Sequence, residues 1–185
     1  MNCADIRRYC ELGIVPPGVA AEQALEALNT TKPSNTFELW GFLSAKVHKA
    51  NGDIEDKGLI SVRKVTTAFA DYIVDSLQDS TTSPLDNFSY HAMGTDNTAE
   101  SNTNTALGTE VESRTDGSQT EGASTNIYKS VGTISATGSH SITEHGLLSA
   151  SSGGTLLDRS VFSAISVTSG DSIEFTYELT VNAES

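Results

Sequence analysis

The sequence predicts a mainly β protein: an antiparallel β-sandwich of the jelly-roll or immunoglobulin-like kind, with one packed helix and an N-terminal arm. Short segments of alternating apolar and polar residues recur through residues 36–185, with turn-forming residues between them. Residues 65–77 have helical spacing instead. Residues 1–35 hold only two short helix-forming pieces, too short to bury a core of their own. We therefore expect an arm, residues 1–35, and a sandwich domain, residues 36–185, that includes the helix.

Composition narrows the class of partner. The chain has 185 residues, of which 37% are hydrophobic, and 11 basic against 24 acidic residues give a net charge of −13. Such an acidic protein repels phosphate backbones and anionic lipid, so we expect neither nucleic acid nor membrane as a partner. The two cysteines, Cys3 and Cys10, are expected to be free thiols. The N-terminus does not read as a signal peptide, and no apolar stretch is long enough to cross a bilayer, so we expect synthesis in the cytoplasm.

The arm is expected to lie against another surface. Residues 5–12 favour a short helix, which Pro16, Pro17 and Gly18 interrupt. Residues 20–28 favour a second helix with Leu25 on its apolar side. A disordered leader is the alternative interpretation of the same residues.

The first strand of the sandwich is predicted over residues 37–48. One face of it holds the nonpolar residues Phe37, Leu39, Gly41, Leu43, Ala45 and Val47, and the other holds Glu38, Trp40, Phe42, Ser44, Lys46 and His48. Asn51 and Gly52 predict a hairpin turn, because both accept a positive φ. The return strand is predicted over residues 54–62.

The period then lengthens to that of a helix. Val65, Phe69, Tyr72, Ile73 and Leu77 recur at helical spacing and predict a helix over residues 65–77. Thr66 or Thr67 is available as its N-cap, and the polar residues 79–84, which end in a proline, terminate it.

The remaining strands are predicted from shorter alternating runs. They are expected over residues 88–93, 107–114, 119–125, 128–137, 142–149, 157–167 and 173–181. The last run alternates most clearly, with Ile173, Phe175, Tyr177, Leu179 and Val181 expected to point inward. Residues 94–125 are very polar, and we expect strands with one solvent-exposed face there. Disorder is the alternative interpretation.

Residues that could carry catalysis do not form a recognisable pattern. Ser139, His145 and Asp158 could be assembled into a triad, but the Gly-x-Ser-x-Gly turn that presents a nucleophilic serine is absent. Glu144 and His145 are adjacent on a predicted strand, so their side chains should diverge rather than share a metal. We interpret them as a turn or edge pair that contacts Arg159.

Other polar residues are equally unspecific. His48, His91 and His140 are isolated in the sequence. The spacing of Asp96, Asn97 and Glu100 is not that of an EF-hand loop. A calcium ion bound nonspecifically to this acidic loop stays an alternative. Gly153 and Gly154 predict a flexible turn, and Glu110 and Glu112 could share a strand face like the carboxylates of a glycosidase. We expect no catalytic, cofactor or metal site, and a hydrolase acting on cell-surface glycan is the weakest hypothesis.

Several longer stretches resemble one group of proteins. These are DKGLISVRKV, TAFADYIVDSLQ and FSYHAMGTDNTAE, followed by a C-terminal region with the motifs TEHG, LLDR-x-VF and GDS. Together they resemble structural (virion) proteins of tailed bacteriophages, of the capsid cement or decoration type. The resemblance spans about four-fifths of the chain, from Phe37 to Ala183, and leaves out the arm.

The resemblance implies a non-enzymatic protein on the exterior of the virion capsid. Such a protein would bridge subunits of the phage major capsid protein and pair with copies of itself, as a dimer or trimer. A tail, neck or tail-fibre protein is the alternative. The residues expected to contact partners are Arg7, Arg8, Tyr9, Ile14, Val15, Leu25, Trp40 and Phe42. For Trp40 and Phe42, burial between sheet and helix is the competing interpretation.

Overall fold

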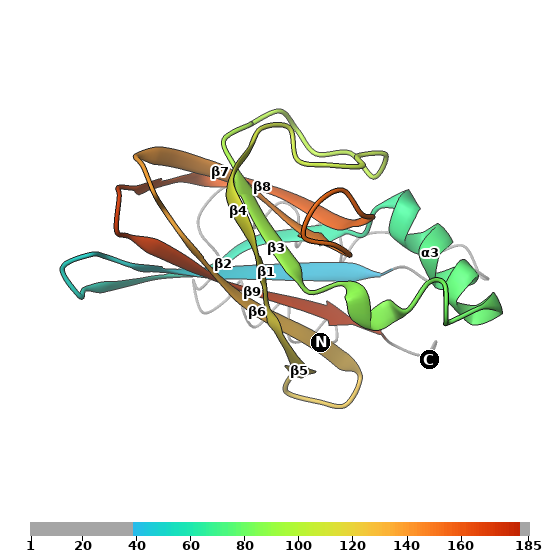
Figure 1. Ribbon diagram of the computed structural model, residues 1–185. Coiled ribbons are helices and arrows are strands. Elements are labelled where there is room, and N and C mark those ends of the chain that lie inside the picture. The colour runs from blue at the N-terminus through green and yellow to red at the C-terminus, as the bar shows by residue number, and fades with distance from the viewer. Residues whose placement is uncertain (1–38, 182–185) are drawn as a thin grey trace.

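The computed structural model describes residues 39–181, which form two antiparallel sheets stacked face to face with a helix at one end (Figure 1). The described elements are β1 (Trp40–His48), β2 (Ile54–Lys64), α3 (Thr67–Gln78), the 3-10 turn η1 (Leu85–Asn87), β3 (Tyr90–Gly94), β4 (Glu110–Asp116), β5 (Ser118–Glu121), β6 (Ile127–Ser135), β7 (His140–Leu148), β8 (Leu156–Val167) and β9 (Ser172–Thr180). The predicted antiparallel sandwich with one packed helix is confirmed. The predicted arm, residues 1–35, lies outside the described residues.

The chain passes repeatedly between the two sheets. Sheet A has the strand order β2-β1-β9-β6-β5, and sheet B has the order β4-β3-β7-β8. Every neighbouring pair is antiparallel. The chain changes sheet after β2, β4, β6 and β8, so neither sheet is built from one continuous segment. The last strand, β9, lies between β1 and β6 at the centre of sheet A.

Strand β9 has the alternation that the sequence predicts. Ile173, Phe175 and Tyr177 have no exposed surface, and Leu179 is 5% exposed. Apolar side chains on one face of a strand bury together because successive residues point to opposite sides. The expectation that Val181 also points inward is wrong, because it lies beyond the end of β9 and is 44% exposed.

Strands β1 and β2 form the predicted hairpin. Leu43, Ala45 and Val47 of β1 are at most 1% exposed and pack into the core with β9. At the turn, Gly52 has a φ of 94°, the left-handed conformation that glycine adopts without strain. Strand β2 runs two residues further than predicted, to Lys64, and its register with β1 shifts twice along the way.

The helix α3 closes one end of the sandwich. It begins at Thr67, two residues later than predicted, because the side chain of Thr66 accepts a hydrogen bond from the Phe69 amide (3.1 Å) and caps the helix. Phe69 and Tyr72 then pack edge to face on Phe88, with ring centroids 4.9 and 4.8 Å apart. Among the described helices, none combines the length and apolar character that a bilayer crossing requires.

The polar region after β3 is ordered into strands and a long loop. Strand β4 begins three residues later than predicted, at Glu110, and β5 ends four residues earlier, at Glu121. Residues 95–109 form the loop between β3 and β4. Leu107 of this loop is 8% exposed and packs with Ala92, Leu148 and Leu156. This loop therefore covers part of the outer face of sheet B.

Candidate functional site

The residues of the hypothetical triad are not brought together. Ser139 is exposed in the turn before β7, whereas His145 is fully buried within that strand. Six residues of extended strand separate them, which corresponds to about 20 Å. His145 instead contacts His91 and Phe175, with ring centroids 5.1 and 4.5 Å apart. These contacts place His145 in the core of the sandwich.

His145 belongs to a buried polar chain that the sequence did not suggest. Its Nε2 lies 2.9 Å from Nδ1 of His91, and Nε2 of His91 lies 2.9 Å from the Ser130 hydroxyl. The His145 Nδ1 atom is buried without a hydrogen-bond partner. We assign the proton to His145 Nε2, because the other tautomer would bury an N–H group without an acceptor. The interpretation of His91 as an isolated residue is thus wrong.

Burial keeps both histidines neutral. Desolvation lowers the pKa of His91 to about 4, although the nearby Asp116 carboxylate opposes the shift. Desolvation, and then the charge of His91, lowers the pKa of His145 well below its ordinary value. A neutral imidazole pair can share one proton in a hydrogen bond, whereas two cations at this distance repel each other.

Asp158 and Tyr177 form a second polar group in the core. Asp158 is 1% exposed, and one of its oxygens accepts a hydrogen bond from the Ser160 hydroxyl (2.7 Å). Its other oxygen and the Tyr177 hydroxyl have no hydrogen-bond partner. Burial raises the pKa of Asp158 to about 6, against the opposing effects of Ser160 and the charge of Arg63. Burial also raises the pKa of Tyr177, and the charge of Asp158 adds to that shift.

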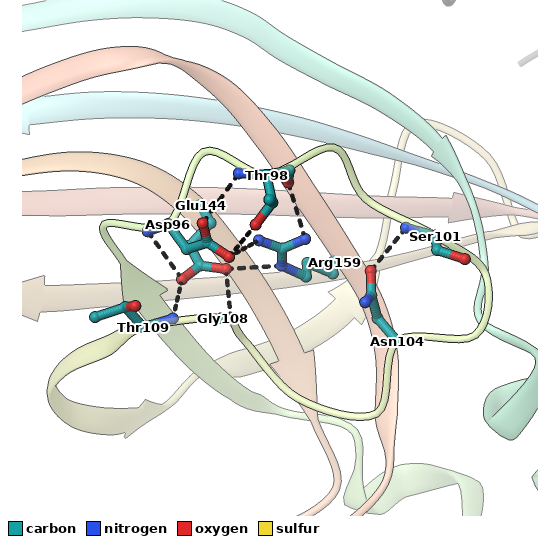
Figure 2. A network of polar contacts seen from close by, with 8 residues as sticks. All are labelled: Asp96, Thr98, Ser101, Asn104, Gly108, Thr109, Glu144 and Arg159. Atoms are coloured by element: carbon teal, nitrogen blue, oxygen red, sulfur yellow. Dashed lines mark hydrogen bonds and ion pairs between the residues drawn. The ribbon is translucent and has the colours of Figure 1, made fainter.

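On the outer face of sheet B, Glu144 and Arg159 form a fully buried ion pair (Figure 2). Arg159 Nε donates to Glu144 at 2.7 Å, and the two side chains are 2% and 0% exposed. The predicted contact with Arg159 is confirmed. The interpretation of Glu144 and His145 as a turn or edge pair is wrong, because β7 lies between β3 and β8 and both residues are fully buried.

The ion pair fastens the loop of residues 95–109 onto the sheet. Glu144 accepts hydrogen bonds from the amides of Asp96 (3.3 Å), Gly108 (2.9 Å) and Thr109 (2.7 Å). Arg159 donates to the Thr98 carbonyl (3.2 Å) and to Asp96 (3.1 Å). Glu144 thereby binds both ends of the loop, as Figure 2 shows. We call these contacts the loop clamp.

The acidic residues that suggested calcium are paired with arginines. Asp96 accepts from Arg159, and Glu100 pairs with Arg63. Hydrogen bonds from the hydroxyl and amide of Thr98, and to a smaller extent the charge of Arg159, lower the pKa of Asp96. Within residues 39–181, the His, Cys, Asp and Glu side chains form no group of three or more that could hold a metal ion.

Glu110 and Glu112 serve two different structural contacts rather than one site. Glu110 accepts two hydrogen bonds from Arg114, one from Nε and one from Nη2. Nη1 of Arg114 donates to the carbonyls of Ala150 and Gly153. Gly153 and Gly154 have φ values of 63° and 76°, in line with the predicted turn. Glu112 has a φ of 63° at an irregular point of the β3–β4 pair.

That conformation of Glu112 brings its carboxylate to a different part of the chain. It accepts hydrogen bonds from the Thr137 amide (2.8 Å) and from His140 Nε2 (2.9 Å). These bonds lower the pKa of Glu112 against the effect of burial. His140, interpreted as isolated from the sequence, therefore has a partner.

The expected partner contacts divide into two groups. Phe42 is 5% exposed and Trp40 is half-buried. The other six, Arg7, Arg8, Tyr9, Ile14, Val15 and Leu25, lie outside the described residues. Their role as contacts stays a prediction.

An apolar cavity opens at the α3 end of the sandwich. It has a volume of about 280 Å³ and is lined by Leu39, Phe69, Ile73, Leu85, Phe88, Tyr128, Leu157, Leu179 and Val181. The Tyr128 hydroxyl is the one polar side-chain group in this lining. The cavity can thus hold an apolar group, but it does not present an acid, a base and a nucleophile to a substrate.

Comparison with known proteins adds no relative: no family model, curated protein or solved structure matches the chain. The class of the described part is therefore defined by its geometry. It is a two-sheet sandwich whose buried ionisable groups contact its own strands and loops.

Proposed function

We propose that the chain is a non-enzymatic structural protein of a tailed-bacteriophage virion, and within that class a capsid cement (decoration) protein. It binds the outer surface of the head and bridges major capsid protein subunits. Its role is mechanical: it raises the free energy needed to separate neighbouring subunits of a shell that is under outward pressure from packaged DNA.

The observation that carries the proposal is the position of the motifs TEHG and LLDR in the interior of the structure. Their ionisable residues Glu144, His145, Asp158 and Arg159 are between 0% and 4% exposed, and all four face protein rather than solvent. Glu144 and Arg159 fasten the strand pair to its loop, and His145 and Asp158 lie in the core between the sheets. The motifs that resemble virion proteins thus specify architecture, which is what a structural protein needs.

The charge and the topology also favour this role. A net charge of −13 disfavours contact with packaged DNA and suits the outside of the head. The chain changes sheet four times, so segments far apart in the sequence tie the two sheets together, an architecture that favours rigidity. Many copies at symmetry-related joints act through effective concentration, so each contact needs only moderate affinity.

The test is the copy number of the chain in purified particles, measured by quantitative mass spectrometry. A cement protein should be present in numbers comparable to the major capsid protein, and particles lacking it should release DNA at a lower temperature. A far smaller copy number would contradict the cement role and favour a tail, neck or fibre protein. Absence from mature particles would contradict both.

A further inference from the structure

Most of the exposed large hydrophobic side chains of the described residues gather at the α3 end of the sandwich. Among residues 39–181, five large hydrophobic side chains are exposed: Ile54 (62%), Val74 (53%), Leu77 (81%), Leu85 (44%) and Val181 (44%). All except Ile54 lie in α3, in η1 or directly after β9, next to the apolar cavity. Clustered exposed hydrophobic groups of this kind mark interaction sites.

The cavity is open to an incoming side chain. Leu85 and Val181 line it and are each 44% exposed. A second, wider hollow of about 570 Å³ shares Leu85, Tyr128 and Val181 with it and continues over the surface to Glu121 and Asp86. The two together form a groove that starts apolar and ends acidic, which we call the α3 groove.

The surroundings of the α3 groove carry negative charge. Asp71, Asp75, Asp79 and Asp86 are all exposed on α3, at its C-terminal end or on η1. The sequence contains no lysine or arginine between Lys64 and Arg114. An occupant that combines apolar side chains with positive charge would therefore be favoured by both burial and electrostatics.

One segment of this chain outside the described residues has that combination. Residues 6–15, IRRYCELGIV, carry two arginines against one glutamate; Arg7 and Arg8 precede Tyr9, and Ile14 and Val15 end the segment. The next apolar segment, residues 20–28, carries two glutamates and no basic residue, so the acidic surroundings would repel it.

We propose that the α3 groove binds residues 6–15 of this chain, with an apolar side chain in the cavity and Arg7 and Arg8 against the aspartates. The described chain begins at Leu39, which itself lines the cavity. The 24 residues from Val15 to Leu39 span up to about 80 Å when extended, so the segment reaches the groove of its own chain or of a neighbouring copy. The proposal stands independently of the role in a virion.

Paramagnetic NMR on the full-length chain tests this placement. A nitroxide is attached to Cys10 in a Cys3→Ser variant, and the methyl signals of Ile, Leu and Val are recorded with the label oxidised and reduced. We expect Ile73, Leu85 and Val181 to lose most of their intensity in the oxidised state. Ile54, exposed at the far hairpin, is the internal control and should keep its intensity.

Charge variants and mixed samples complete the test. Arg7→Glu with Arg8→Glu should restore the Leu85 and Val181 signals, whereas Arg7→Lys with Arg8→Lys should leave them weakened. Mixing isotope-labelled chains that lack the nitroxide with nitroxide-bearing unlabelled chains shows whether the segment comes from a neighbour. The proposal is overturned if the groove methyls keep their intensity in both kinds of sample, or if Ile54 loses as much as they do. Because particles are not involved, this result is separate from the copy-number test.

Discussion

Neighbouring residues of β7 and β8 send ionisable side chains to opposite faces of the same sheet. Glu144 and Arg159 lie on the outer face under the loop, and His145 and Asp158 lie on the inner face in the core. On the outer face, each charge has an opposite charge and further hydrogen bonds. On the inner face, His145 Nδ1 and one Asp158 oxygen have no hydrogen-bond partner.

The difference shows what makes a buried charge tolerable. Both faces are shielded from water, so desolvation acts on both. Where the strand pair supplies a counter-charge and the loop supplies amides, the ion pair is retained. Where it does not, the pKa values shift toward the neutral form: that of His91 falls to about 4, and that of Asp158 rises to about 6, which leaves Asp158 with a destabilising charge at neutral pH. The free energy of unfolding should thus fall when one partner of the outer-face ion pair is removed, and it should depend on pH through the groups on the inner face.

The largest effect is expected from Arg159→Met, which should lower the free energy of unfolding by about 3 to 5 kcal/mol. The substitution leaves the Glu144 carboxylate buried without a counter-charge. Urea unfolding at neutral pH measures the loss. Adding Glu144→Gln should recover part of it, because glutamine keeps an acceptor for the loop amides without the charge.

The matched control for Arg159→Met is Lys46→Met. Lys46 pairs with Glu174 at 3.9 Å, and the two side chains are 48% and 30% exposed. An exposed pair of this kind contributes less than about 1 kcal/mol. Equal losses in the two variants would show that the loop clamp does not stabilise the fold.

On the inner face, Asp158→Asn should stabilise the protein at neutral pH, by about 3 kcal/mol. The pKa of Asp158 is raised from 3.8 to about 6, so its charged form is destabilising above pH 6. Stability from the protonated acid is complete below 3.8 and is lost as the pH rises through 6. Asparagine stays neutral and can still accept from Ser160. The gain, measured by urea unfolding, should vanish below pH 4, and a loss at neutral pH would contradict the assignment.

Acidification of the Asp158→Asn variant should reveal the histidine pair. The pKa of His91 falls from 6.5 to about 4 on folding, so the unfolded chain binds more protons between these values. Stability is therefore present above pH 6.5 and is lost as the pH falls. Between pH 7 and 4.5 the loss from His91 is about 2.5 kcal/mol. In the unsubstituted protein Asp158 acts in the opposite direction and flattens this dependence. A flat profile in the variant would contradict burial of a neutral pair.

Local sequence patterns predicted the inner faces of single strands well. The alternation of β9 places Ile173, Phe175 and Tyr177 in the core, and the helical spacing from Val65 to Leu77 locates α3 within two residues. These features depend on side-chain period and on a nearby cap, which are local properties of the chain.

The polar clusters could not be predicted in the same way. In the pairing of β3 with β7, Met93 lies opposite His145. His91 is two residues from Met93 on the same face of β3, and it therefore reaches His145. The two strands are separated in the sequence by a long loop and by other strands. Which strands become neighbours depends on the whole topology, so His91 looked isolated in the sequence. The edge assignment of Glu144 failed for the same reason, whereas its divergence from His145 followed from strand alternation alone.

The smallest effect is expected at the rim of the loop clamp, where Thr98→Val should cost about 1 kcal/mol or less. The Thr98 hydroxyl donates to Asp96, whose side chain is 26% exposed, so water can replace the lost bond. The Thr98 amide still donates to Asp96 at 3.0 Å. The change should nevertheless speed hydrogen exchange of the Gly108 and Thr109 amides, because Asp96 helps to hold Arg159 against Glu144.

Thr81→Val is the control for Thr98→Val, because Thr81 bonds Asp79 in the same local arrangement. Asp79 follows α3 and is not tied to an arginine of the loop clamp. Thr81→Val should therefore leave the exchange of Gly108 and Thr109 unchanged. If both variants altered it equally, the effect would come from a general loss of stability. If neither did, Glu144 and Arg159 would hold the loop without Asp96, and the outer network would be confined to the ion pair and the amides that Glu144 binds.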